Sequence, residues 1–189
     1  MQFPPIHLAS RSPRRKQLLE ALGFEVILVD VDYEEKLSEQ IPSIEVSRYH
    51  AIQKARSVVQ HINDEDIILA ADTTVLLENR IFHKPKDQQD AYNILETLSG
   101  RKHQVITGVC IKHGAKEINF TECADVYMAK MTSEEILYYI DQYKPYDKAG
   151  SYGIQEWIGL AKIEKIEGSY FNIVGLPTHR VYQEIQNIL

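Results

Sequence analysis

The sequence has little of what marks several specialised protein classes. Its 189 residues include only two cysteines, Cys110 and Cys123, which fall in separate expected strands without the spacing of metal ligands. We expect both to be buried, reduced thiols of a cytoplasmic protein. No apolar run is long enough to span a bilayer, and the N-terminus lacks the basic-then-apolar pattern of a signal peptide, so we expect a soluble protein.

The chain also lacks a net positive charge and the common enzyme motifs. Its 21 Lys and Arg residues against 27 Asp and Glu residues give a net charge of -6, which argues against a dedicated nucleic-acid binder. A local basic cluster could still bind an anionic small molecule. There is no P-loop, GxGxxG, HExxH or GxSxG motif, so kinases, Rossmann dehydrogenases, zinc proteases and serine hydrolases lose their usual support.

Apolar periodicity and turn residues divide the chain into alternating helices and strands. With 44% hydrophobic residues it can bury a sizeable core, and we expect one folding unit over residues 1–189, as one large domain or one with two lobes. Expected helices begin at Pro13, cover 44–62, follow Asp87 to Gly100, run from Thr132 to before Pro145, and begin at about Thr178; expected strands cover 6–9, 67–71, 75–77, 81–82, 103–111, 118–128, 158–166 and 169–174. Hairpins are too frequent for a strict βαβ series, which predicts a mixed α/β fold, with a mixed sheet flanked by helices.

The first helix begins at a junction rich in hydroxyl and guanidinium groups. We expect Ser12 to be its N-cap and Pro13 its first residue. Arg14 and Arg15 in the first turn add positive charge to an end that is already partly positive, which costs stability. Either an anion such as a phosphate or polyphosphate binds here, or this is a basic turn exposed to solvent.

Asp72 lies between apolar runs that we expect to be buried. A buried carboxylate costs free energy unless it is paired, hydrogen-bonded or bound to a metal. The hydroxyl groups of Thr73 and Thr74 could supply partners, and Asp72 would then only anchor a turn at the strand end. The functional alternative is a carboxylate at a strand end that faces a cleft.

Three further segments carry polar groups that could serve such a site. Lys84 precedes Pro85 on an expected rigid turn, which is weak support by itself. The loop 147–155 has glycines that allow a ligand close to the backbone, and Gln155 offers a donor and an acceptor to a base edge, although such a loop is as often a plain connection. Glu34 and Glu35 could help to hold a divalent ion, but acidic clusters after a strand are more often solvated.

Seven short motifs follow one another along nearly the whole chain: Leu8-Ala9-Ser10 with Ser12-Pro13-Arg14-Arg15, Gln53-Lys54-Ala55-Arg56, Ala71-Asp72-Thr73, Lys84-Pro85, Leu98-Ser99-Gly100 with Val105-Ile106-Thr107, Asp147-Lys148-Ala149-Gly150 through Tyr152-Gly153-Ile154-Gln155, and Gly168-Ser169-Tyr170 with Gly175-Leu176-Pro177. In this order they resemble the Maf family of nucleoside triphosphate pyrophosphatases. The resemblance implies a homodimeric cytoplasmic enzyme that hydrolyses a nucleoside triphosphate to the monophosphate and pyrophosphate with a divalent cation, Mg²⁺ or Mn²⁺. It also implies a fold related to that of the inosine triphosphate pyrophosphatases, with a cleft between two lobes.

The same resemblance implies roles for single residues. Asp72 corresponds to the catalytic carboxylate and proton acceptor, and Asp72 with Glu34 or Glu35 would meet the metal. The positions assigned to the phosphates are Ser10, Arg15, Lys54 and Lys84, and those that separate the dTTP/UTP branch from the 7-methyl-GTP branch are Arg14, Thr73 and Gln155. One departure is His83, where relatives often carry glycine, and it puts the shape of that loop in doubt.

Two other functions agree with the same residues. One is a nucleotide-binding regulator of cell division with little catalysis, as the family's older description as septum-formation inhibitors suggests. The other is a pyrophosphatase for modified purine triphosphates such as 7-methyl-GTP. Asp72 beside the phosphate-binding cations favours catalysis, because binding alone needs no base. An ordinary aspartate, with a pKa of about 3.9, is a weak base near neutral pH, so we favour metal assistance to the attacking water.

Overall fold

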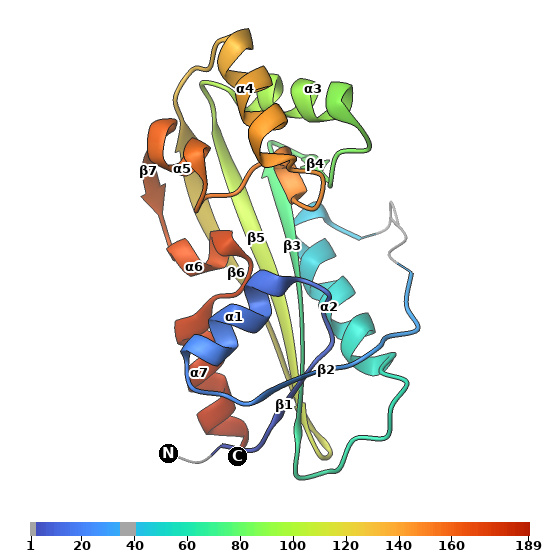
Figure 1. Ribbon diagram of the computed structural model, residues 1–189. Helices are drawn as coiled ribbons and strands as arrows, with labels where there is room; N and C mark the ends of the chain where they lie inside the picture. The colour runs from blue at the N-terminus through green and yellow to red at the C-terminus, as the bar shows by residue number, and fades with distance from the viewer. Residues whose placement is uncertain (1–2, 35–40) are drawn as a thin grey trace. The chain divides into compact units, whose positions relative to one another are not determined.

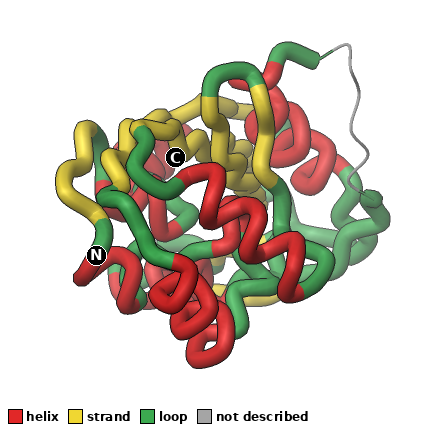
Figure 2. The backbone as a smooth tube through the Cα atoms, turned by 90° about the horizontal axis from the view of Figure 1, so that it is seen from above, coloured by secondary structure: helices red, strands yellow, loops and turns green. Residues whose placement is uncertain are grey.

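The computed structural model describes residues 3–34 and 41–189. The chain divides into two compact units: unit 1 is Met1–Asp72, Thr107–Glu122 and Gly175–Leu189, and unit 2 is Thr73–Ile106 and Cys123–Val174. The strands are β1 (Ile6–Leu8), β2 (Val26–Leu28), β3 (Ile67–Leu77), β4 (Arg80–Phe82), β5 (Lys102–His113), β6 (Lys116–Met128) and β7 (Ile163–Glu167) (Figure 1). The helices are α1 (Pro13–Ala21), α2 (Val46–Arg56), α3 (Gln88–Leu98), α4 (Ser133–Tyr143), α5 (Trp157–Ala161), α6 (Tyr170–Val174) and α7 (Thr178–Ile188), with short 3-10 turns η1 (Ser43–Glu45) and η2 (Ala149–Ser151) (Figure 2).

The strands of the described residues form one mixed sheet, which confirms the expected fold class. Their order is β2-β1-β3-β5-β6-β7, with β4 paired to β3. Strand β1 is parallel to β2 and β3, whereas β3–β4 and β6–β7 are antiparallel. The chain connections explain this mixture, because α1 and α2 allow parallel crossovers while a two-residue turn joins β3 to β4.

In unit 1, alternate residues of β3 face different helices. Ile67 and Leu69 belong to a large apolar cluster with Leu19 of α1 and Val181 of α7. Ala70, which points the other way, packs against small residues of α2. Unit 1 is therefore a sheet covered by α1 and α7 on one face and by α2 on the other.

Helix α2 lies unusually close to the sheet of unit 1. A side chain at Gly108 of β5 would place its Cβ only 2.2 Å from the backbone nitrogen of Arg48. The neighbouring contacts are made by small residues as well, Ala51 and Ala55 on the helix and Cys110 on the strand. This close packing fixes where the polar residues of α2 lie relative to β3.

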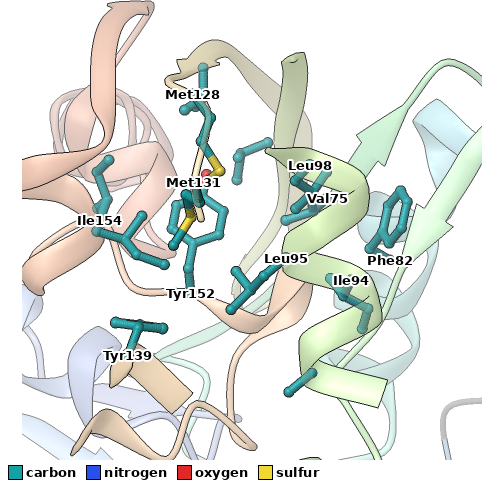
Figure 3. Close-up of a cluster of buried hydrophobic side chains, with 14 of the residues drawn as sticks. Val75, Phe82, Ile94, Leu95, Leu98, Met128, Met131, Tyr139, Tyr152 and Ile154 are labelled. Atoms are coloured by element: carbon teal, nitrogen blue, oxygen red, sulfur yellow. The ribbon is translucent and has the colours of Figure 1, made fainter. Parts of the chain in front are cut away.

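Unit 2 has its own apolar cluster, in which α3 and α4 contribute the helical side (Figure 3). Both helices begin as expected: Asp87 Oδ1 accepts a hydrogen bond of 2.8 Å from the Asp90 N–H, and Thr132 forms a capping box with Glu135. The buried residues of this cluster include Val75, Leu95, Leu98, Tyr139, Tyr152, Ile154 and Ile158.

The expectation of strands over 158–166 and 169–174 was correct only for 163–166, which lies in β7. The structure has α5, then the strand β7, then α6. Short apolar runs do not distinguish a strand from a helical turn, and here tertiary packing decides, because Ile158 and Ile173 are buried in the apolar cluster of unit 2. The helix expected over 44–62 also ends early, at Arg56, and Val58 bridges to Val31 instead.

The two cysteines differ, so the expectation of two buried thiols is half wrong. Cys110 is buried in unit 1, and burial raises its pKa to about 12. Cys123 is exposed, because it alternates along β6 with the buried Ala124. Among the helices of the described residues, none combines the length and apolar character needed to cross a membrane.

Candidate active site

The candidate site of unit 1 lies where the parallel pairing of β1 with β3 ends. These parallel strands are in register, with Leu8 opposite Leu69, and the Ala9 N–H donates a hydrogen bond of 2.8 Å to the Leu69 carbonyl. Sheets of this kind bind ligands beyond the carboxyl ends of their parallel strands. Ser10 follows β1, whereas Asp72 lies within β3, which continues to Leu77, so the expectation that Asp72 stands at a strand end was wrong. Both residues still lie just past the last parallel pair, Leu8 with Leu69, a position that suits ligand binding.

Asp72 is paired with Lys54, which α2 supplies. Asp72 has the same parity along β3 as Ala70 and therefore points to the face that α2 covers. The Lys54 ammonium lies 2.7 Å from Asp72 Oδ1, and each side chain is only 12% exposed. The expected cost of burying this carboxylate is thus offset by a charged partner.

The structure does not favour the alternative in which Asp72 merely anchors a turn. Strand β3 continues past Asp72 to Leu77, so no turn begins there. Thr74 Oγ1 is buried and has no hydrogen-bond partner among the described residues. The apolar periodicity of α2 predicts that Lys54 and Arg56 face solvent. This holds for Arg56, whose exposed guanidinium pairs with Glu117 at 2.7 Å, but not for Lys54.

A second pair, Ser10 and Arg15, lies at the junction of β1 and α1. Arg15 Nη1 donates a hydrogen bond of 2.9 Å to Ser10 Oγ, and Arg15 Nε donates one of 2.8 Å to the Gly175 carbonyl. Arg15 is 8% exposed, so its guanidinium is held in place inside unit 1. Gly175 was not recognised as a partner from sequence, because a backbone carbonyl 160 residues away leaves no local pattern.

The N-terminus of α1 is positively charged. Ser12 occupies the N-cap position as expected, but within the described residues its side chain makes no capping hydrogen bond. Its own N–H instead donates to Ser10 Oγ over 3.2 Å. The first turn contains no acidic residue, and Arg14 there is partly exposed. A helix N-terminus beside guanidinium groups suits a phosphate, because the helix dipole and the side chains are both positive there.

The carboxylates expected to meet a metal are only partly described by the structure. Glu34 is exposed, and Glu35 lies outside the described residues. Within residues 3–34 and 41–189, no group of three or more His, Cys, Asp or Glu side chains could hold a metal ion. Asp72 alone still fits Mg²⁺, because this ion commonly takes one or two carboxylates together with substrate phosphates and water.

In unit 2, the segment that carries Lys84 lies beside the glycine-bearing loop. The Gly150 N–H donates a hydrogen bond of 3.3 Å to the His83 carbonyl, which precedes the exposed Lys84. His83 is not among the described non-glycine residues with positive φ, so its backbone has no need of glycine. The departure from the family pattern at this position therefore leaves the loop shape intact.

Gln155 is the exposed residue at the end of a buried stretch. Residues 151–154 are buried, and Gln155 follows them into solvent. Thr73 is partly exposed and is the next residue of β3 after Asp72. Within each unit, the structure thus brings together Ser10 with Arg15, Lys54 with Asp72, and the Lys84 segment with the loop that bears Gln155.

Comparison with known proteins identifies relatives over nearly the full chain. The family described as Maf-like protein matches residues 5–188. The dTTP/UTP pyrophosphatase of Parabacteroides distasonis is 45% identical over 184 residues, which cover 96% of this chain and 95% of that protein. The enzymes of the same name from Bacteroides fragilis strain YCH46 and Porphyromonas gingivalis strain W83 are each 42% identical, over 97% and 96% of this chain and 95% and 93% of theirs.

Among solved structures, the Ham1 protein of Staphylococcus aureus is similar over 66% of this chain and 72% of that one. The TM-score of this match is 0.46, and the sequences are 17% identical.

Proposed function

The chain belongs to the family of Maf-like proteins, and from this premise we propose that it hydrolyses dTTP and UTP to the nucleoside monophosphate and pyrophosphate. The observation that carries the proposal is the Lys54–Asp72 pair just past the parallel pairing of β1 with β3, in a relative of dTTP/UTP pyrophosphatases. A binding protein would need the cations but not a carboxylate held beside them.

The reaction would divide between phosphate binding and water activation. By the family resemblance, Ser10, Arg15, Lys54 and Lys84 would neutralise the triphosphate oxygens. A water molecule attacks the α-phosphorus, the bond from the α-phosphorus to the bridging oxygen breaks, and pyrophosphate leaves. Asp72 accepts the proton that the water loses.

We also propose that a divalent cation, Mg²⁺ or Mn²⁺, enters with the triphosphate. Asp72 is the carboxylate that would contact it, and the phosphates would supply further oxygens, which fits the absence of a multi-residue metal cluster in the described part of the chain. When bound, such a cation lowers the pKa of a coordinated water and neutralises phosphate charge.

Selectivity for the base would come from Arg14, Thr73 and Gln155. The uracil and thymine edges present an acceptor, a donor and an acceptor, and the carboxamide of Gln155 can match part of that edge with both its N–H and its carbonyl. A cationic 7-methylguanine would instead favour an acidic partner. A homodimer, a cytoplasmic location and the lack of a nucleic-acid partner are further proposals, supported by the family resemblance and the net charge of -6.

A nucleotide panel tests this function. Pyrophosphate and orthophosphate release would be measured separately for UTP, dTTP, CTP and 7-methyl-GTP with Mg²⁺ or Mn²⁺. We expect pyrophosphate to be released with the highest kcat/KM for UTP and dTTP. A preference for 7-methyl-GTP would refute the pyrimidine assignment, and binding without release would support a regulator.

The variant Gln155→Glu tests the base contact in the same assay. We expect its preference for UTP over 7-methyl-GTP to fall by more than its kcat for UTP, because a carboxylate loses the N–H donor and favours a cationic base. Gln142→Glu, the same change at an exposed position of α4, is the matched control and should leave the preference unchanged.

A further inference from the structure

The loop before Gln155 is held by glycines that have no room for a side chain. At Gly150, which has a φ of 70°, an added Cβ would lie 2.8 Å from Val75 Cγ2. At Gly153, an added Cβ would lie 2.8 to 3.0 Å from the carboxylate of Glu156. Ser151 between them has a φ of 61°, a strained backbone for serine that the surrounding structure must maintain. The backbone leading to Gln155 is therefore tightly constrained.

One carboxylate ties the two ends of this loop together. Glu156, at the end of the loop, lies with Oε1 3.1 Å from the ammonium of Lys148 at its beginning. The Lys148 side chain is 10% exposed and the Glu156 side chain 18% exposed, so solvent screens this pair only weakly. Lys148 is also 2.8 Å from Asp147 Oδ1. The Lys148–Glu156 pair thus closes the loop across its base.

A tyrosine of α4 connects this pair to the middle of the loop. The Tyr139 hydroxyl donates a hydrogen bond to Glu156 Oε2 and accepts one of 2.9 Å from the Gly153 N–H. Tyr139 lies fully buried in the apolar cluster of unit 2 (Figure 3). Burial, and secondarily the bond to Glu156, raise the pKa of this phenol, so it stays protonated and keeps donating.

Apolar packing alone does not require the hydroxyl of Tyr139. A phenylalanine would fill the same space in the cluster, and a buried hydroxyl costs free energy unless its hydrogen bonds are made. Here the one hydroxyl serves as donor and acceptor for two groups that flank Gln155, the N–H two residues before it and the carboxylate one residue after it. The arrangement orders the loop backbone, whereas the Gln155 side chain itself is exposed.

We propose that Tyr139, Glu156 and Lys148 form a positioning network that holds Gln155 in place to select the pyrimidine base. The inference deepens the proposed function and rests on it. None of the three residues needs to touch the substrate, so they are positioning residues. Because a displacement of about 1 Å in a recognition group can cost on the order of a hundredfold, loosening this loop should change selectivity more than phosphate chemistry.

The test compares Tyr139→Phe with the wild type for UTP and 7-methyl-GTP. We expect the ratio of the two kcat/KM values to fall about tenfold, mainly through a higher KM for UTP with kcat largely retained. Tyr138→Phe makes the same change at an exposed position one residue earlier in α4 and should leave the ratio unaltered. Glu156→Gln keeps the side-chain size but removes the charge that pairs with Lys148, and it should change the ratio in the same direction. This variant provides the test if Tyr139→Phe does not fold.

A double-mutant cycle separates positioning from general destabilisation. In a Gln155→Ala background, Tyr139→Phe should cause no further loss of selectivity, because the group that it positions is gone. If both Tyr139→Phe and Glu156→Gln keep the wild-type ratio within twofold, or if their effects persist unchanged in the Gln155→Ala background, the inference is overturned while the proposed function stands. A wild type that cleaves both nucleotides equally well would overturn the pyrimidine selectivity in the proposed function, and with it the role proposed for this network.

Discussion

Replacing Asp72 by asparagine should remove turnover and leave the fold. Asparagine has nearly the same shape but cannot accept a proton from the attacking water. Loss of a general base usually costs a factor of about 10² to 10⁴, so we expect kcat for UTP to fall to about 1% of the wild-type value or below. The assay is pyrophosphate release under saturating UTP and Mg²⁺, with UTP binding measured separately by calorimetry.

The stability cost of Asp72→Asn follows from its partner. The 2.7 Å contact to Lys54 joins two side chains that are each 12% exposed. A hydrogen bond between charged groups contributes about 1.5 to 3 kcal/mol, and the asparagine carbonyl would retain a neutral bond of about 1 kcal/mol. The net loss of about 0.5 to 2 kcal/mol should lower Tm by roughly 1 to 8 °C in a chain of this size.

Asp125→Asn is the matched control for this prediction. Asp125 pairs with Lys102 at 2.6 Å, but the Lys102 side chain is 49% exposed, so the pair should contribute less than about 1 kcal/mol. We expect this variant to keep wild-type turnover and nearly wild-type Tm. Residual hydrolysis above roughly a tenth of the wild-type rate in Asp72→Asn would refute the assignment of Asp72 as the base, since the expected loss is about a hundredfold or more.

Three further predictions use other parts of the chain. Arg15→Ala and Lys84→Ala should each lower kcat/KM for UTP at least about tenfold, with a loss of Tm only for the buried Arg15; unchanged kcat/KM in both would refute the phosphate site. His103 is buried 2.7 Å from the Tyr152 hydroxyl, and burial lowers its pKa to about 4. The unfolded chain therefore binds more protons between about pH 6.5 and 4, so stability should fall by roughly 3 kcal/mol across that window, and urea denaturation that shows no such slope would contradict this. Under native conditions a maleimide should label Cys123 rapidly and Cys110 only after denaturation, as mass spectrometry of the labelled peptides would show.

The strongly periodic elements were predictable from the sequence, whereas the short ones were not. Helices α3 and α4 carry local signals at both ends, such as the cap at Asp87 and the capping box at Thr132. The five-residue helices α5 and α6 have no such signal, and their apolar residues fit a strand equally well. Packing against the rest of unit 2 decides their conformation, and that information is not local.

The candidate site was likewise only partly predictable from the sequence. The carboxylate at Asp72 and the guanidinium at Arg15 stand out because each contradicts its surroundings, one as a charge in an apolar strand and one as a cation at a helix N-terminus. Their partners do not stand out. Periodicity alone placed Lys54 in solvent, and its pairing with Asp72 depends on how closely α2 approaches the sheet. The bond between Tyr139 and Glu156 joins residues on separate elements that no spacing rule connects.

The candidate site depends on Gly108 because this residue has no Cβ atom. Any side chain at this position would collide with the backbone of α2, and moving the helix would carry the Lys54 ammonium away from Asp72. A large-scale substitution screen scored on hydrolysis should therefore find Gly108 as intolerant as a residue of the site itself. In this protein, a residue can be intolerant of substitution because its contacts set the geometry of the site, even when it is not one of the proposed site residues.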